Sequence, residues 1–385
     1  MQRRATFRTR RRGTSGPALG SRRGCPTVIA AAVLVLAAVL TASASARHSG
    51  IANGTLKPPI KEFLLPTPDA RPLGITTGPD GNVWFVEFLG NKVGRITPSG
   101  DVTEFPIPTA NSTPDAIVTG PDGNLWFTEV VGNKIGRITP DGVITEFAVP
   151  TPNARPTVIA AGPDGNLWFT ERRASTAEPG KIGRITTAGV ITEFATPTPG
   201  SRPVGITGGP DGNVWFTEST VDKVGRITPT GAITEFPLPA ACPPQPRCQP
   251  HEITSGPDGA LWFTEAFGNK IGRITTAGVI TEFDLPHPNS GPNVITPGPA
   301  GTLVFAETGL LPDTGNRIGA ISVDGDIVEW DIPTAGAAPI GVTRGPASDI
   351  WFTETGTLTA PGERIGRIVG ARGQLTAALR SGHAP

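Results

Sequence analysis

One segment recurs seven times along this chain, and it constrains the fold more than any other feature. The unit reads G-P-D-G-N-L-W-F-T-E, then K-I-G-R-I-T, then G-x-I-T-E-F, then P-T-P. Its Gly-Pro pairs are spaced 42 or 47 residues apart and begin at Gly78, Gly120, Gly162, Gly209, Gly256, Gly298 and Gly345. A period of this length is typical of arrays in which each repeat is one supersecondary unit.

Each repeat contains four short segments of strand character. In the first repeat they are residues 74–77, 83–87, 92–97 and 101–105. All are rich in β-branched and aromatic residues and are bounded by turn-forming residues, and helical periodicity is absent. We therefore predict an all-β fold for residues 60–370, a seven-bladed β-propeller of four-stranded antiparallel blades.

The two ends of the repeat array predict how the ring closes. A fourth-strand pattern at 60–63 precedes the first Gly-Pro pair, and none follows Ile368. The N-terminal strand should therefore complete the last blade, which leaves no open sheet edge. The Trp of each second strand is expected to pack between neighbouring blades. Residues 371–385 are expected to form a frayed C-terminal tail.

The first 46 residues do not follow the repeat. They hold eight arginines and no acidic residue, followed by the apolar run 28–40 and by Ala44-Ser45-Ala46. This is the pattern of a secretory signal peptide, so we expect a secreted protein with a linker at 47–59. An uncleaved membrane anchor is the alternative, although a spanning helix needs ~20 apolar residues.

The charge and the cysteine content of the chain after the leader limit which partners it can have. Residues 47–385 carry 25 basic and 33 acidic residues, a net charge of −8 with His neutral. We expect no nucleic-acid partner, no stable membrane contact after signal removal, and a monomer. Cys242 and Cys248 are the only cysteines of this part and are predicted to form a disulfide. A zinc site is the alternative, but it lacks a second cysteine pair.

The strand order predicts a binding face. Connections from fourth to first strands and from second to third strands share one face, here called the top face, and every five-residue insertion falls on it. Such variable loops usually mark the binding face of a repeat protein. The residues around the proline before each first strand should face its central mouth and contact a small-molecule or peptide ligand, with drift on an exposed surface as the alternative. The predicted ligand contacts are Arg71, Asp115, Arg155, Arg202 and Asn293.

Every second strand ends in a glutamate, which forms a predicted ring of seven carboxylates. Such a ring could hold a metal ion. Each Glu is also followed across its hairpin by a cation, as Glu87 is by Lys92, so a cross-strand ion pair is the alternative.

The repeat resembles that of the virginiamycin B lyase family, seven-bladed propellers that inactivate streptogramins. The match spans about Ile60 to Ile368. The resemblance implies elimination at the ester linkage of a cyclic depsipeptide, with Mg²⁺ and a set of His and Glu residues on the top face.

The family motifs match this chain in part. Pro250-His251-Glu252-Ile253-Thr254 matches the P-H-x-I-T motif, so the resemblance makes His251 a catalytic candidate. The Glu-Pro-His triplet of the next blade is replaced by Gly291-Pro292-Asn293, and a further family Glu falls at Thr308. Glu307 and His287 are the candidates to substitute for these groups. Glu265 and Glu307 are the candidates to lie near Mg²⁺.

Two functions from different classes follow. One is a magnesium-assisted carbon–oxygen lyase that linearises a cyclic depsipeptide or lactone, which needs a base, an acid and an electrophile. The other is a noncatalytic secreted propeller that binds a ligand, glycan or protein on its top face. The replaced triplet favours the second.

Overall fold

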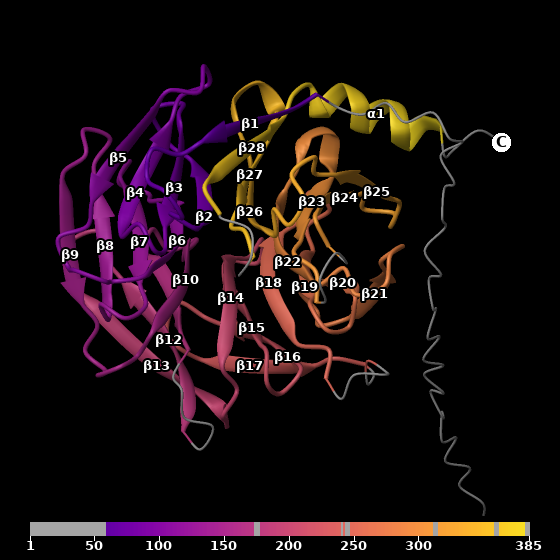
Figure 1. Cartoon of the computed structure of the whole chain (residues 1–385). Coiled ribbons are helices and arrows are strands. Elements are labelled where there is room, and N and C mark those ends of the chain that lie inside the picture. The colour runs from indigo at the N-terminus through magenta and orange to yellow at the C-terminus, as the bar shows by residue number, and fades with distance from the viewer. Residues whose placement is uncertain are drawn as a thin grey trace, which may run out of the picture. The chain divides into compact units, whose positions relative to one another are not determined.

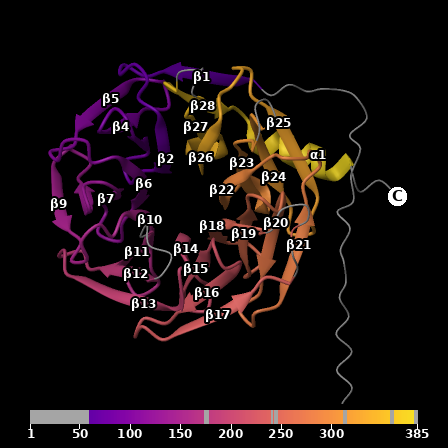
Figure 2. The same ribbon diagram turned by 60° about the horizontal axis from the view of Figure 1, so that its bottom comes forward.

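The computed structural model describes residues 59–172, 178–239, 242, 247–310, 315–357 and 362–381. They form seven four-stranded antiparallel sheets around an axis, one sheet per repeat (Figures 1 and 2), so the predicted seven-bladed β-propeller is confirmed. The expected leader at 1–46 and nearly all of the linker lie outside these residues. Within the described ranges, no helix has the length and apolar character to cross a membrane.

Within blades one to six the strands follow the sequence order, and in every blade the first strand is innermost in the view of Figure 2. Blade one consists of β2 (Pro72–Thr77), β3 (Val83–Glu87), β4 (Lys92–Ile96) and β5 (Val102–Pro106). Blade two consists of β6 (Pro114–Thr119), β7 (Leu125–Glu129), β8 (Lys134–Ile138) and β9 (Ile144–Ala148). Blade three consists of β10 (Pro156–Ala161), β11 (Leu167–Glu171), β12 (Pro179–Ile185) and β13 (Ile191–Pro199). Blades four and five are β14 (Pro203–Gly208), β15 (Val214–Glu218), β16 (Lys223–Ile227) and β17 (Ile233–Pro237); β18 (Pro250–Ser255), β19 (Leu261–Glu265), β20 (Lys270–Ile274) and β21 (Ile280–Asp284). Blade six is β22 (Pro292–Pro297), β23 (Leu303–Glu307), β24 (Arg317–Ile321) and β25 (Ile327–Asp331), and blade seven is β26 (Pro339–Arg344), β27 (Ile350–Glu354), β28 (Arg364–Ile368) and β1 (Ile60–Leu64).

The N-terminal strand closes the ring as predicted. Strand β1 pairs antiparallel with β28, from Ile60 opposite Ile368 to Leu64 opposite Arg364. The Phe63 ring stacks on Trp351 with centroids 5.7 Å apart, close to the 5.6 Å between Trp84 and Phe105 inside blade one. The closing junction therefore reproduces the packing of an internal blade.

Apolar side chains of adjacent blades pack together around the tryptophans. Trp84 is fully buried against Ile117 and Phe127 of the next blade, and its Nε1 donates a hydrogen bond to Asp80 Oδ1 at 3.0 Å. The six tryptophans of the second strands are all fully buried, which confirms their predicted place in the core.

The expectation of a frayed C-terminal tail is wrong. Residues Ala371–Ser381 form helix α1, which packs beside blade six and contacts its short 3-10 turn Pro299–Gly301. Ala371 and Leu375 are fully buried in a cluster with Trp330 and Ile332. This cluster also holds Val304, where blade six lacks the tryptophan of the other blades. The helix forms because it covers this apolar surface.

A bulge in each first strand aims side chains at the axis. In β18 the pairing shifts between Pro250 and Ile253, so the intervening residues leave the regular ladder. A threonine of the second strand satisfies the freed backbone: Thr264 Oγ1 accepts from Glu252 N at 3.1 Å and donates to Asn293 O at 2.6 Å in the next blade. Bulges re-aim side chains in this way, and here they position the residues of the candidate site.

Candidate functional site

A cavity of about 360 Å³ lies along the axis between the first strands and is here called the central pocket. Most of its lining is aliphatic side chain and backbone. Its more polar side chains include Asp115, Thr157, Arg172, His251, Glu252 and Asn293. A concave cavity in which apolar side chains surround a few convergent polar groups is the usual form of a ligand site.

A second cavity of about 390 Å³ adjoins the first and is here called the mouth pocket. It shares Asp115, Thr157 and Arg172 with the central pocket and adds Arg155 and Arg202. Arg155 and Arg202 precede the prolines that open β10 and β14, and Arg172 follows β11. The mouth pocket is therefore built from top-face connections of blades three and four, with Phe88 and Val130 of blades one and two as its apolar side.

His251 is held as a neutral imidazole. Burial, and to a lesser extent the positive charge of Arg172, lowers its pKa to about 4. The Nδ1 atom is buried and has no hydrogen-bond partner among the described residues. At neutral pH the ring can therefore accept a proton from a group in the central pocket.

Two carboxyl groups of the central pocket have raised pKa values. Burial raises the pKa of Asp115 to about 6, and the charge of Arg172 partly offsets this effect. Burial, with a smaller contribution from the nearby Asp115, raises the pKa of Glu252 to about 8. Backbone N–H groups of Ile253 and Ile206 act against this rise. At pH 7 Glu252 is therefore mainly protonated and can donate a hydrogen bond.

Arg172 and Glu252 are pocket residues that the sequence analysis missed. Both occupy positions at which the repeat carries other residue types. In the other blades, the position of Arg172 is occupied by Phe88, Val130, Ser219, Ala266, Thr308 or Thr355. The position of Glu252 is occupied by Gly74, Ala116, Val158, Gly205, Val294 or Gly341. A charged residue at an otherwise uncharged repeat position was the available signal.

The predicted ligand contacts separate into two groups. Asp115 and Asn293 line the central pocket, Asp115 also lines the mouth pocket, and Arg155 and Arg202 line the mouth pocket alone. Arg71 lies outside both. Its Nε is 3.2 Å from Asp69 Oδ1 and its Nη2 is 3.3 Å from the backbone oxygen of Thr357.

His287, a candidate to substitute for the missing family groups, lies in the connection between β21 and β22 and outside the lining of both pockets. Its side chain is 50% exposed, and Nδ1 is 2.5 Å from Glu329 Oε2 of β25, a fourth strand. Thr67 and Thr109 occupy the same repeat position and bond to the fourth-strand glutamates Glu104 and Glu146. His287 is therefore the blade-six form of a contact between blades, and it does not line the central pocket.

The glutamates that end the second strands are buried, and in blades one, two, four and five the lysine across the hairpin pairs with a glutamate of the fourth strand instead. Lys134 Nζ lies 2.7 Å from Glu146 on the fourth strand, and Lys223 and Lys270 make the same contact with Glu235 and Glu282. Burial and the adjacent Glu104 charge raise the pKa of Glu87 to about 8. The expected cross-strand pair is wrong in these blades. Arg317 is an exception, with Nη1 3.7 Å from Glu307 Oε2.

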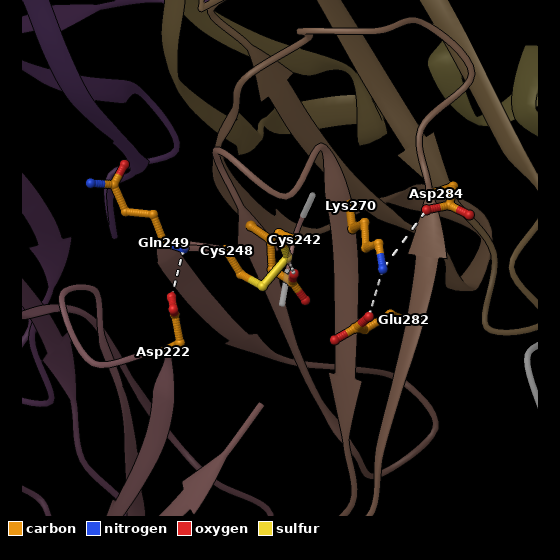
Figure 3. The surroundings of a disulfide bond; sticks show 8 residues. Asp222, Cys242, Cys248, Gln249, Lys270, Glu282 and Asp284 are labelled. Carbon is orange, nitrogen blue, oxygen red and sulfur yellow. Dashed lines mark hydrogen bonds and ion pairs between the residues drawn. A yellow bond between two sulfur atoms is a disulfide. The ribbon is translucent and has the colours of Figure 1, made fainter. Parts of the chain in front are cut away.

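Cys242 and Cys248 form a disulfide on the top side of blade five (Figure 3). The backbone N of Gln249, next to the bridge, donates to Asp222 Oδ1 at 2.9 Å. Glu265 is fully buried beneath the bridge, with Oε2 3.5 Å from Cys242 Sγ. Because each sulfur is bonded to the other, this group is not available as a set of thiolate ligands.

The described residues do not fit the expected magnesium site. Magnesium prefers near-octahedral oxygen ligands, in proteins mainly carboxylates and waters. Glu265 and Glu307 are fully buried and lie outside the lining of the central pocket. Among the residues that the structure describes, the one close group of three potential ligand residues is Cys242, Cys248 and Glu265. In the central pocket the positive charge of Arg172 would oppose a cation, so no chemical step is assigned to magnesium.

A family comparison agrees with this architecture. The model of the virginiamycin B lyase family matches residues 25–177, 149–243 and 240–378. The chain belongs to the virginiamycin B lyase family. A streptogramin B lyase structure is 40% identical, with a TM-score of 0.71 over 80% of this chain and 96% of that one.

Two further relatives carry the family name. Virginiamycin B lyase from Staphylococcus aureus is 40% identical, with a TM-score of 0.71 over 80% of this chain and 98% of that chain. The structure of its catalytically inactive histidine-to-alanine variant with quinupristin gives the same identity, TM-score and coverage. Virginiamycin B lyase of Bacillus licheniformis is 47% identical over 41 residues, which are 11% of this chain and 14% of that protein.

Proposed function

We propose that this chain is a carbon–oxygen lyase that opens a cyclic ester, either a depsipeptide or a lactone, by elimination at its top-face mouth. The observation that carries the proposal is the neutral His251 imidazole, which lines the central pocket with Arg172 and Glu252. Similarity to streptogramin B lyase over 80% of the chain supports the same reaction class.

The residues of the central pocket can supply the groups that an elimination needs. His251 takes the proton from the carbon next to the one that bears the ester oxygen, and the C–H electron pair forms a carbon–carbon double bond. The C–O bond breaks, and its electrons leave with the carboxylate. Arg172 stabilises negative charge that develops on the adjacent carbonyl oxygen. Glu252 is protonated at pH 7 and donates a hydrogen bond to the departing oxygen.

The low pKa of His251 sets a condition on this reaction. A general base is most efficient when its pKa lies near the working pH, and about 4 is well below it. Part of the lowering comes from the charge of Arg172. A substrate that brings negative charge to Arg172 would raise the pKa of His251 and make it a stronger base.

The test is turnover of a streptogramin B-type depsipeptide and of simpler lactones. His251→Ala should lower the rate by at least about 100-fold, the usual cost of losing a general base, with the fold intact. His287→Ala is the matched control, because His287 lies at an exposed position outside the central pocket and should leave the rate unchanged. Equal rates for wild type and His251→Ala would contradict the assignment.

A noncatalytic binding propeller is the second candidate, and Gly291-Pro292-Asn293 favours it. Asn293 lines the central pocket, and its Oδ1 is buried without a partner among the described residues, so it can bind a ligand but cannot act as a base at neutral pH. Saturable depsipeptide binding in titration calorimetry without any turnover would establish this function in place of the lyase.

We further propose that the protein is exported and acts as a monomer. The composition of residues 1–46 and the Cys242–Cys248 disulfide support export. N-terminal sequencing of the protein from culture medium should begin near Arg47. A chain that retains its first residues in the membrane fraction would instead indicate an uncleaved anchor.

A further inference from the structure

Positive charge is concentrated in one sector of the ring, although the scaffold repeats sevenfold. The guanidinium groups of Arg155, Arg172 and Arg202 line the mouth pocket together with a single carboxylate, Asp115. The equivalents of Arg172 in the other six blades carry no cation. Blades three and four therefore bring three positive charges to one cavity, and blade two adds one negative charge, Asp115.

These arginines lack the contacts that would explain them as parts of the scaffold. Arg71 occupies the same repeat position as Arg155 and Arg202 and pairs with Asp69. Arg155 and Arg202 have no ion pair among the described residues, and the Nε atoms of Arg172 and Arg202 are buried without a hydrogen-bond partner there.

The charges also repel one another inside the pocket. Burial lowers the pKa of Arg172, and the charges of Arg202 and Arg155 lower it further, while Asp115 only partly offsets them. An anion that enters the mouth pocket would relieve this repulsion and pair with guanidinium groups, which match carboxylate and phosphate in geometry.

We propose that the mouth pocket is a binding site for an anionic group of the ligand, a carboxylate or a phosphate, held by Arg155, Arg172 and Arg202. The two pockets share Asp115, Thr157 and Arg172, so the rest of the ligand extends over the central pocket towards His251. The substrate of the proposed lyase is then a cyclic ester that also bears an acidic group. This last step rests on the proposed function, whereas anion binding itself does not.

The test is titration calorimetry at low salt with citrate as the carboxylate probe and pyrophosphate as the phosphate probe. Wild type should bind at least one of them with one-to-one stoichiometry, and the tighter probe identifies the anion class. Arg155→Gln and Arg202→Gln should each weaken binding by at least about 10-fold, because each removes a charge-assisted contact. Higher salt should weaken binding by all of these proteins.

Arg71→Gln is the matched control. It removes the same charge from the same repeat position, but Arg71 pairs with Asp69 outside the mouth pocket, so affinity should change less than about 2-fold, within the range expected of exposed charges. Equal weakening by all three variants, or no saturable binding of either probe, would overturn the proposal. Anion binding without lyase turnover would refute the proposed lyase and leave the anion site intact. Turnover without anion binding would refute the anion site and leave the proposed lyase intact.

Discussion

Removal of the Phe63 ring should destabilise the protein as much as removal of its counterpart inside a blade. Phe63 is half-buried, stacks on Trp351 and approaches Gly100 of the neighbouring blade. A fully buried Phe→Ala change costs about 3–5 kcal/mol, so half-burial plus the lost stack gives about 2–3 kcal/mol for Phe63→Ala. Phe105→Ala should cost the same, because Phe105 makes the same stack on Trp84.

Guanidinium unfolding at constant m-value measures these changes. Leu64→Ala is the control: it lies on the same strand, is 62% exposed, and should cost less than about 0.5 kcal/mol. A Phe63→Ala protein as stable as Leu64→Ala would refute closure of the ring by β1. A cost well below that of Phe105→Ala would show that the closing junction is weaker than an internal one.

Three further predictions concern the disulfide, the buried carboxyl and the C-terminal helix. Titration of the unreduced, unfolded protein should find no free thiol from Cys242 and Cys248, and reduction should cost at most ~2–3 kcal/mol for so short a loop. The pKa of Glu252 is raised from 4.5 to about 8, so its contribution to stability is complete below pH 4.5 and is lost as pH rises through 8. The free energy of unfolding of Glu252→Gln should therefore equal that of wild type at pH 4. At pH 9 it should be higher than that of wild type by about 2–5 kcal/mol. Equal pH dependence of the two proteins would contradict this shift. Leu375→Ala should cost about 2–4 kcal/mol, and an unchanged unfolding midpoint would show that α1 does not pack on blade six.

The repeat itself made most of the fold predictable. Turn residues at fixed offsets set the strands, and the early strand at 60–63 indicated the closure between β1 and β28. Helix α1 was missed because its stability comes from the surface it covers. Leu375 packs on a blade-six cluster that is remote in sequence, and nothing in residues 371–381 alone indicates that surface.

The candidate site was predicted in part from the positions where the repeat varies around the proline of the first strand. Asp115 and Asn293 were found in this way and line the central pocket, whereas His251 was found through the family motif. The ion pairs of the lysines were not predictable from hairpin spacing. Glu87 lies directly opposite Lys92 in the register, yet the lysine side chain reaches across to Glu104, which is less deeply buried than Glu87. Desolvation, which the sequence pattern does not show, decides which glutamate carries the charge.

The central claim is that His251 starts an elimination in which no water is added. The most direct test is the mass of the product formed from a cyclic depsipeptide in water enriched with heavy oxygen. The account predicts a ring-opened product that has the mass of the substrate and carries no heavy oxygen from water. This product should not form when His251→Ala replaces wild type. A product heavier by one labelled water would show hydrolysis and contradict the proposed mechanism.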